Sequence, residues 1–127
     1  MILDTSAVVA IFVKEAGFEA LVQKLAAGAS GIGTPTLAET GVVLAARLRA
    51  DPRPLLMRFV QEFGVALVPF GEVHWREAVE AYQRFGKGRH AASLNFGDCL
   101  SYATALHARR PLLCVGDDFR RTDLPLA

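Results

Sequence analysis

The chain has 127 residues, a length that fits one compact domain able to bury a core without disulfides or a structural metal. Hydrophobic residues make up 52% of it, and the charged residues balance to a formal net charge of +1. Net charge of this size gives no indication of nucleic-acid binding. The apolar share favours elements buried on both faces, an apolar interface, or both. We therefore treat residues 1–127 as a single domain and expect a partner protein.

The chain contains no predicted targeting or membrane segment. Its first apolar stretch is interrupted by Asp4 and lacks a positive start, so it does not match a signal peptide. No apolar run reaches the roughly 20 residues that span a membrane. Cys99 and Cys114 lie in apolar runs without C-x-x-C spacing, which predicts small buried side chains. We expect a cytoplasmic protein with free thiols.

Apolar periodicity predicts strands that alternate with helices. Short apolar runs predict strands at residues 1–3, 30–34, 65–68 and 112–115. Helical spacing and helix-start residues predict helices over residues 8–12, 18–25, 34–51, 54–63, 72–85 and 98–107. Strands separated by helices need crossover connections. We therefore predict an α/β fold with a mostly parallel central sheet flanked by helices on both faces.

Several acidic residues stand where a predicted helix begins or a strand has just ended: Asp4, Glu39, Asp98, Asp117 and Asp118. Side chains at the carboxyl ends of parallel strands meet at one edge of the sheet, although they are distant in sequence. Carboxylates that converge there repel one another unless a cation neutralises them. Mg²⁺ suits such a site because it prefers oxygen ligands and keeps several waters.

Each acid also has an ordinary structural explanation. Asp4 and Asp98 can cap the helices that follow them. Glu39 completes a T-x-x-E capping box with Thr36. Asp117 and Asp118 follow Gly116 and can be turn residues. The coincidence of all these cases favours a functional cluster.

Four segments resemble the PIN-domain family, and most closely the VapC toxins of bacterial toxin–antitoxin pairs. They are MILDTSAVVAIFVKE at the start, TLAET around Glu39, GKGRHAASLNFGDCLSYATA around Asp98, and LLCVGDDFRRTDL near the end. Together they span nearly the whole chain in the right order. The resemblance implies a PIN-like fold for residues 1–127.

The resemblance also implies a catalytic site. Asp4, Glu39 and Asp98 match the acidic triad of the family, with Asp4 and Asp98 as the expected Mg²⁺ ligands and Mn²⁺ as an alternative ion. The family's fourth acid often lies in T-x-D, whereas here Gly116 precedes two aspartates, so Asp117 and Asp118 both stay candidates. In the family, a water activated by the metal attacks the RNA phosphodiester and leaves a 5′-phosphate and a 3′-hydroxyl.

Further polar residues are candidates for substrate contacts. Thr5 and Ser6 can hydrogen-bond a ligand acid or a phosphate, or simply start a helix. The RFGKGRH stretch offers Lys87 and Arg89 to an RNA backbone, and its alternative is a solvated loop. We expect His74 and His107 on helix surfaces. We expect Trp75 to pack rather than to stack on a base.

The resemblance implies a homodimer, an RNA substrate and a VapB-type antitoxin that occupies the acidic groove. A phosphohydrolase with Asp4 as nucleophile is one alternative, but its D-x-D pattern is absent because Ser6 stands at the second position. A second alternative is a non-catalytic interaction module whose acids only cap helices. A DNA-directed nuclease of the same fold is the third.

Overall fold

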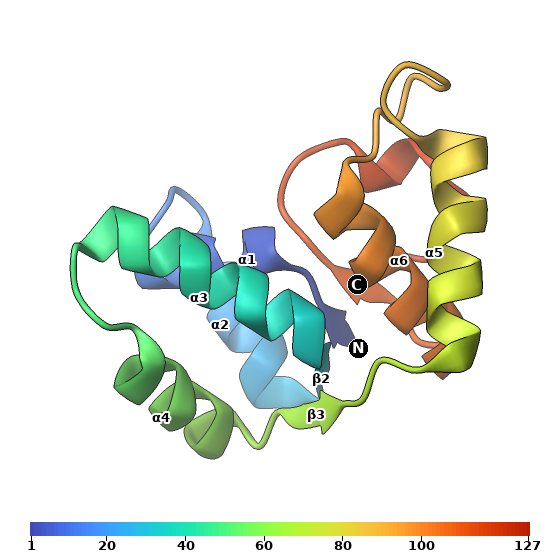
Figure 1. Cartoon of the computed structure of the whole chain (residues 1–127). Coiled ribbons are helices and arrows are strands. Elements are labelled where there is room, and N and C mark those ends of the chain that lie inside the picture. The colour runs from blue at the N-terminus through green and yellow to red at the C-terminus, as the bar shows by residue number, and fades with distance from the viewer.

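Four short strands alternate with six α-helices in the computed structural model, which describes residues 1–127 (Figure 1). The strands are β1 (Ile2–Leu3), β2 (Gly31–Gly33), β3 (Ala66–Val68) and β4 (Leu112–Leu113). The helices are α1 (Thr5–Phe12), α2 (Phe18–Ala27), α3 (Thr34–Leu48), α4 (Arg53–Phe63), α5 (Glu72–Phe85) and α6 (Phe96–Ala108), followed by a 3₁₀ turn, η1 (Phe119–Arg121). Every predicted strand and helix is present.

The strands form one parallel sheet in the order β3-β2-β1-β4. In register, Ile2 lies opposite Gly31 on one side and Leu112 on the other. All strands therefore end at the same edge of the sheet. The predicted parallel α/β architecture is confirmed, and this edge is where the segments that begin with Asp4 and Cys114 leave the sheet.

Helices cover both faces of the sheet, as expected. Successive strand residues point to opposite faces, so Ile2 and Leu112 join one core cluster while Leu3 and Leu113 join the other. The first cluster is closed by α5 and α6, and the second by α1 to α4. Figure 1 shows these two groups of helices on opposite sides of the strands. Gly33 lets α6 approach β2 closely, because a Cβ there would lie 2.8 Å from the Thr104 hydroxyl oxygen.

Several element ends differ from the prediction by one to three residues, among them ends of α3, β4 and α6. Helix α3 ends at Leu48 because Arg49 adopts a left-handed conformation (φ 52°). Strand β4 ends at Leu113, and the Val115 amide donates to the Ser6 hydroxyl instead of continuing the ladder. Helix α6 begins earlier than expected, at Phe96.

The prediction that His74 lies on a helix surface is wrong, whereas the same prediction for His107 is confirmed. His74 is buried because its ring stacks on Phe70 and meets His107 edge-on, and its Nδ1 accepts from the Gly71 amide. Trp75 does not pack into the core: it is 48% exposed, and its Nε1 donates to Glu72.

The cysteines behave as predicted. Cys99 is buried and Cys114 is half-buried, and both are free thiols. Burial raises the pKa of each thiol to about 11, so both are protonated at neutral pH. Among the helices, none has the combination of length and hydropathy that crossing a membrane requires.

Candidate functional site

Asp4 is a buried carboxylate at the end of β1, with 3% of its surface exposed. It is the N-cap of α1: its Oδ2 accepts from the Ser6 amide at 3.0 Å and from the Ser6 hydroxyl at 2.6 Å. Its Oδ1 accepts from the Ser101 hydroxyl of α6 at 2.6 Å. The capping explanation is therefore correct but incomplete, because the same carboxylate also joins α6 to the end of β1.

Glu39 does not form the capping box that the sequence suggested. Helix α3 begins at Thr34 with Gly33 as its N-cap, so Thr36 lies inside the helix. The Glu39 carboxylate instead accepts from the Thr5 hydroxyl. It also lies directly on Gly97, where a side-chain Cβ would overlap its Oε2. Glu39 thus sits against the first turn of α6, beside Asp98.

Asp98 lies in that first turn, but it is not the N-cap as predicted: Asn95 is the N-cap, and Asp98 completes its capping box. Its amide donates to Asn95 Oδ1 at 2.9 Å, and its Oδ2 accepts from the Asn95 amide at 3.0 Å. Its Oδ1 has no hydrogen-bond partner, so one oxygen is available to a ligand. Burial raises the pKa of Asp98 to about 6, against the opposing hydrogen bond from Asn95. Neighbouring negative charges raise it further, those of Asp4, Asp118 and Glu39.

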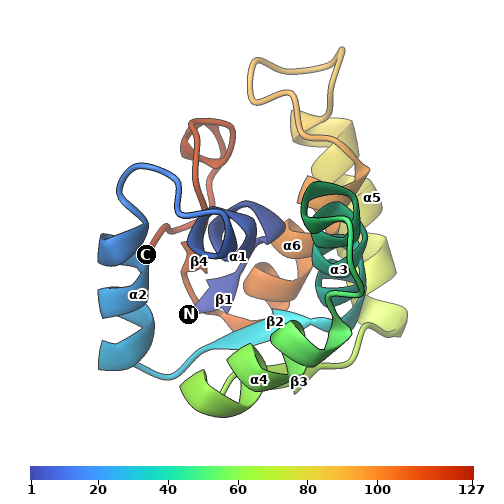
Figure 2. The ribbon, with the colours of Figure 1, turned by 90° about the vertical axis from the view of Figure 1, so that its left-hand side faces the viewer.

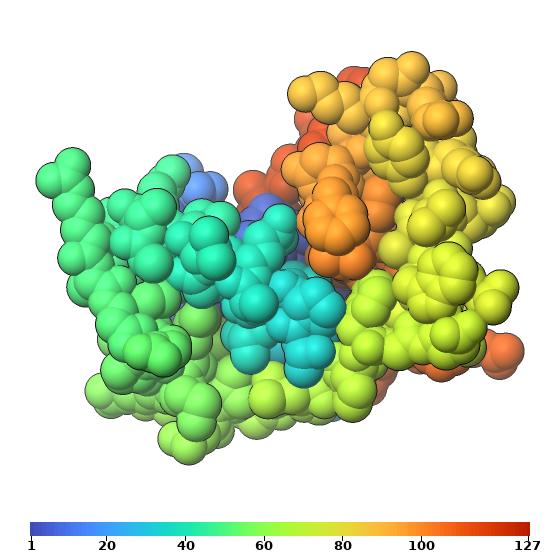
Figure 3. Space-filling model, in the orientation of Figure 1, coloured from blue at the N-terminus to red at the C-terminus, as the bar shows by residue number.

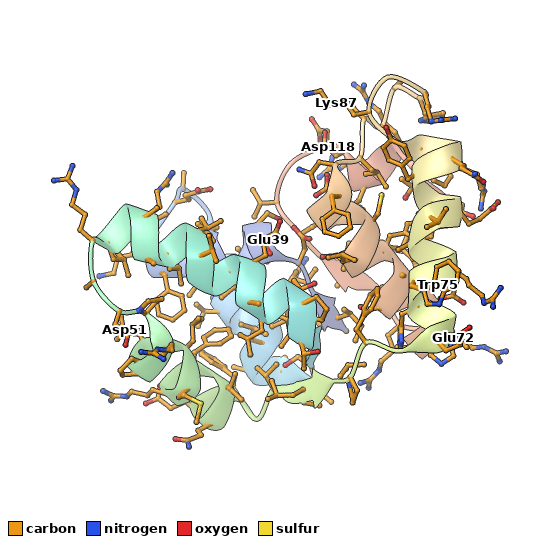
Figure 4. The ribbon with its side chains drawn as sticks, in the orientation of Figure 1. Glu39, Asp51, Glu72, Trp75, Lys87 and Asp118 are labelled. Carbon is orange, nitrogen blue, oxygen red and sulfur yellow. The ribbon has the colours of Figure 1, made fainter.

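The two candidates for the fourth acid face different surroundings. Asp117 is exposed and pairs with Arg120 at 3.6 Å. Asp118 is exposed without a hydrogen-bond or ion-pair partner, and its charge contributes to the raised pKa of Asp98. Figure 4 places Asp118 near the end of α6 where Asp98 lies. We therefore define the acid cluster as Asp4, Glu39, Asp98 and Asp118.

Hydroxyl groups hold the acid cluster together. Thr5 and Ser6, expected as possible substrate contacts, already bond Glu39 and Asp4 respectively. Ser101, which sequence reasoning missed, is fully buried and binds Asp4. Its signal was a serine three residues after Asp98, which places both on one face of α6. Gly97 was also missed, because its importance depends on the approach of a distant helix.

A basic loop follows α5 and projects beyond the helix ends, on the side of the molecule where α6 begins (Figure 2). Lys87 and Arg89 in this loop are exposed and make no ion pair, and Arg89 lies over the Tyr82 ring at 5.4 Å. Figure 4 shows Lys87 at the same end of the molecule as Asp118. Arg84, at the end of α5, instead pairs with Asp123 at 3.1 Å. Lys87 and Arg89 are therefore free to meet a ligand.

The donor set fits a hard divalent cation. It consists of carboxylate and hydroxyl oxygens, and the repulsion that raises the pKa of Asp98 is relieved by positive charge. No three Asp, Glu, His or Cys side chains come together to hold an ion by themselves. Mg²⁺ commonly takes one or two protein carboxylates and completes its shell with water and phosphate. Figure 3 shows the surface hollowed between α3 and α6, which leaves room for such ligands.

Comparison with known proteins defines the class. The profile of the PIN domain family matches residues 1–124, and the chain belongs to this family. Over 126 residues it is 45% identical to Ribonuclease VapC36 of Mycobacterium tuberculosis, covering 98% of this chain and 91% of that protein.

Solved structures show the same fold. The crystal structure of M. tuberculosis VapC20, described as a Sarcin-Ricin loop cleaving toxin, superposes with a TM-score of 0.79 at 16% identity, covering 99% of this chain and 97% of that one. A toxin–antitoxin complex from Klebsiella pneumoniae gives a TM-score of 0.71 at 19% identity, covering 99% and 95%. The PIN-like fold expected from the sequence is thereby confirmed.

The raised pKa of Asp98 predicts that Asp98→Asn stabilises the metal-free protein at neutral pH. The folded state binds the proton more tightly than the unfolded state, whose Asp98 has the ordinary pKa of 3.8, so the charged carboxylate costs stability above pH 6 and nothing below pH 3.8. Asparagine can still accept from the Asn95 amide. After discounting for solvent screening, we expect a gain on the order of 1 kcal/mol.

The measurement is urea unfolding of both proteins in EDTA at pH 7.5 and at pH 4. The gain should be present at pH 7.5 and lost at pH 4, with most of the change between pH 4 and 6. A variant that is less stable than wild type at pH 7.5 would contradict the electrostatic account of Asp98.

Proposed function

We propose that this chain is a metal-dependent endoribonuclease of the VapC type, the toxin of a toxin–antitoxin pair. The observation that supports this most directly is the acid cluster. Asp4, Glu39 and Asp98 come from three separate elements, and the charges of Asp4 and Glu39 both raise the pKa of Asp98. The relationship to VapC ribonucleases at up to 45% identity over nearly the whole chain supports RNA as the substrate.

Asp4 and Asp98 would hold Mg²⁺, or Mn²⁺ in its place. Asp98 offers a free Oδ1, and Asp4 is fixed by three hydrogen bonds from Ser6 and Ser101. When bound, the ion supplies the charge that lowers the pKa of a water and stabilises the phosphoryl oxygens. A carboxylate pair fixed in this way needs no rearrangement to receive a ligand.

The other residues of the site would orient the reactants. Glu39, fixed by Thr5 and pressed against Gly97, presents a carboxylate that can accept a hydrogen bond from the attacking water. Asp118 adds a second free carboxylate and is our choice over Asp117 for the fourth acid. Thr5 and Ser6 act on the acids rather than on the RNA. Lys87 and Arg89 would contact backbone phosphates next to the cluster.

Two apolar grooves support the proposal of protein partners. One of about 450 Å³ lies between α5 and α6 and includes Trp75 and the exposed Phe96. The other, of about 700 Å³, lies between α3 and α4. A homodimer and a VapB-type antitoxin would both need such surfaces. A basic antitoxin side chain placed in the acid cluster would replace the positive charge of the metal. We further propose that the toxin and its antitoxin are located in the cytoplasm.

The direct test is cleavage of labelled total RNA by the chain purified without antitoxin. Wild type is incubated with Mg²⁺ and with EDTA, and Asp98→Asn with Mg²⁺. We expect discrete fragments with a 5′-phosphate only from wild type with Mg²⁺. Matched single-stranded DNA is assayed in parallel.

Cleavage of DNA alone would favour the DNA-directed nuclease. Absence of cleavage together with equal Mg²⁺ binding by wild type and Asp98→Asn would leave only the interaction module. Cleavage that persists in EDTA would exclude a metal-dependent reaction.

Gly97→Ala should inactivate the enzyme without unfolding it. The new methyl group displaces the Glu39 carboxylate, which is the flexible end of its side chain, so the unfolding free energy should change by less than about 1 kcal/mol. Misplacement of a catalytic group should lower the cleavage rate by about 10- to 100-fold. Rates and urea unfolding are measured on the same preparation.

Gly41→Ala is the matched control for this change. A Cβ at Gly41 would meet Leu56 at an ordinary 3.5 Å, and alanine is the better helix former. It should leave the cleavage rate unchanged and add about 0.5–1 kcal/mol of stability. Equal rates for Gly97→Ala and wild type would remove Glu39 from the proposed site.

Replacing both Lys87 and Arg89 with glutamine should weaken RNA binding and leave kcat nearly unchanged. Loss of two phosphate contacts should reduce the slope of log affinity against log salt by about 1.4 for single-stranded RNA. Binding of RNA is measured between 50 and 200 mM salt in EDTA, where the metal-dependent enzyme is expected to leave the RNA uncleaved. Arg76→Gln, which removes an exposed ion pair with Glu72 elsewhere on α5, is the control. An unchanged salt slope would show that the loop is a solvated surface that makes no contact with RNA phosphates.

A further inference from the structure

The side chain of Asp123 connects the C-terminal segment to both helices of one face. Its Oδ1 accepts from the Tyr102 hydroxyl at 2.6 Å, and its Oδ2 accepts from Arg84 Nη2 at 3.1 Å. Tyr102 is 2% exposed and belongs to the core cluster of α6. These hydrogen bonds lower the pKa of Asp123, so it is charged at neutral pH. The segment therefore has one rigid anchor five residues after Asp118.

Both partners of Asp123 lie next to parts of the proposed site. Tyr102 follows Asp98 by four residues on α6, which is about one helical turn. Arg84 stands at the end of α5, directly before the loop that contains Lys87 and Arg89. Asp123 therefore connects the C-terminal segment to the helix that contains Asp98 and to the start of the basic loop.

The Asp118 carboxylate has no hydrogen bond, and the Asp118 carbonyl accepts only from the Arg121 amide at 3.3 Å, so the position of the side chain depends on its flanks. On one side, the Val115 amide donates to Ser6 at 3.0 Å. On the other, Phe119 is buried in the core, and Arg121 Nη1 donates to the Ala91 carbonyl of the basic loop at 3.1 Å. Asp123 then fixes the end of this stretch. Between these anchors, residues 116–118 are exposed.

We propose that Asp123, held by Tyr102 and Arg84, is a positioning residue. It sets Asp118 against Asp98 and ties the stretch of residues 115–123 to the start of the basic loop. The effect of Asp123 on catalysis rests on the proposed nuclease function, whereas its effect on the position of the loop that contains Asp118 does not. Because Asp123 closes the stretch that contains Asp118, loss of its contacts loosens residues 116–118 and displaces the Asp118 carboxylate.

The test uses the full chain with Tyr102→Phe and Arg84→Gln, each alone and each combined with Asp118→Asn. Tyr102→Phe removes one hydroxyl and keeps the core ring, and Arg84→Gln changes a side chain that is nearly half exposed. Arg76→Gln on the same helix is the control. Amide hydrogen exchange of Val115, Arg120 and Arg121, whose amides donate to Ser6, Asp117 and Asp118, is measured together with Mn²⁺ affinity and the separate kcat and KM for RNA.

We expect exchange of the Val115, Arg120 and Arg121 amides to become at least about tenfold faster in both variants and to stay unchanged in Arg76→Gln. We expect Tyr102→Phe to lower kcat by about tenfold with little change in KM, and to weaken Mn²⁺ binding. In the Asp118→Asn background, Tyr102→Phe should lower kcat no further, because the side chain that Asp123 positions is already neutral. Arg84→Lys should restore most of the loss of Arg84→Gln.

Unchanged exchange of the Val115, Arg120 and Arg121 amides in both variants would overturn the proposal. So would losses that add fully to that of Asp118→Asn, since Asp123 would then act through another group. If wild type cleaves no RNA, the nuclease function fails, while hydrogen exchange and Mn²⁺ affinity still decide whether Asp123 positions the loop. If Tyr102→Phe does not fold, Arg84→Gln gives the same decision.

Discussion

The buried carboxylate of Asp4 is the interaction on which the arrangement of the site depends. Removing a carboxylate from water is costly unless donors replace the lost hydration. Ser6 supplies two of these donors from α1, and Ser101 supplies the third from α6. The end of β1, the start of α1 and the middle of α6 are therefore fixed to one another by one side chain. Since Asp98 lies one turn before Ser101, its distance from Asp4 follows from that contact.

The same arrangement places like charges together, and this has an energetic consequence. Burial and the neighbouring acids raise the pKa of Asp98 to about 6, which means that its charged form is disfavoured in the metal-free fold. Hydroxyl donors and capping bonds compensate only in part. The charged form of Asp98 therefore costs folding stability, and perturbed pKa values of this kind cluster at functional sites.

Capping and function coincide in this protein, which explains both the success and the error of the sequence interpretation. Asp4 is the N-cap of α1 and Asp98 completes the capping box of α6, and the Oδ1 of Asp98 stays without a hydrogen bond. A helix N-terminus attracts a carboxylate for its own reasons, so capping alone is no argument against a ligand role. For Glu39, the capping box was wrong because α3 begins two residues before Thr36. Its true partners, Thr5 and Gly97, come from other elements.

The sequence by itself determined the order of strands and helices, the parallel sheet, and the placement of Asp4, Glu39 and Asp98 near element ends. These follow from apolar periodicity and from the handful of ways in which alternating elements can be connected. Only the tertiary structure decided that His74 is buried, that Ser101 binds Asp4, that Gly97 receives Glu39, and that Asp118 rather than Asp117 faces Asp98. Each of these depends on how closely elements distant in sequence approach one another, and local propensity contains no information about that distance.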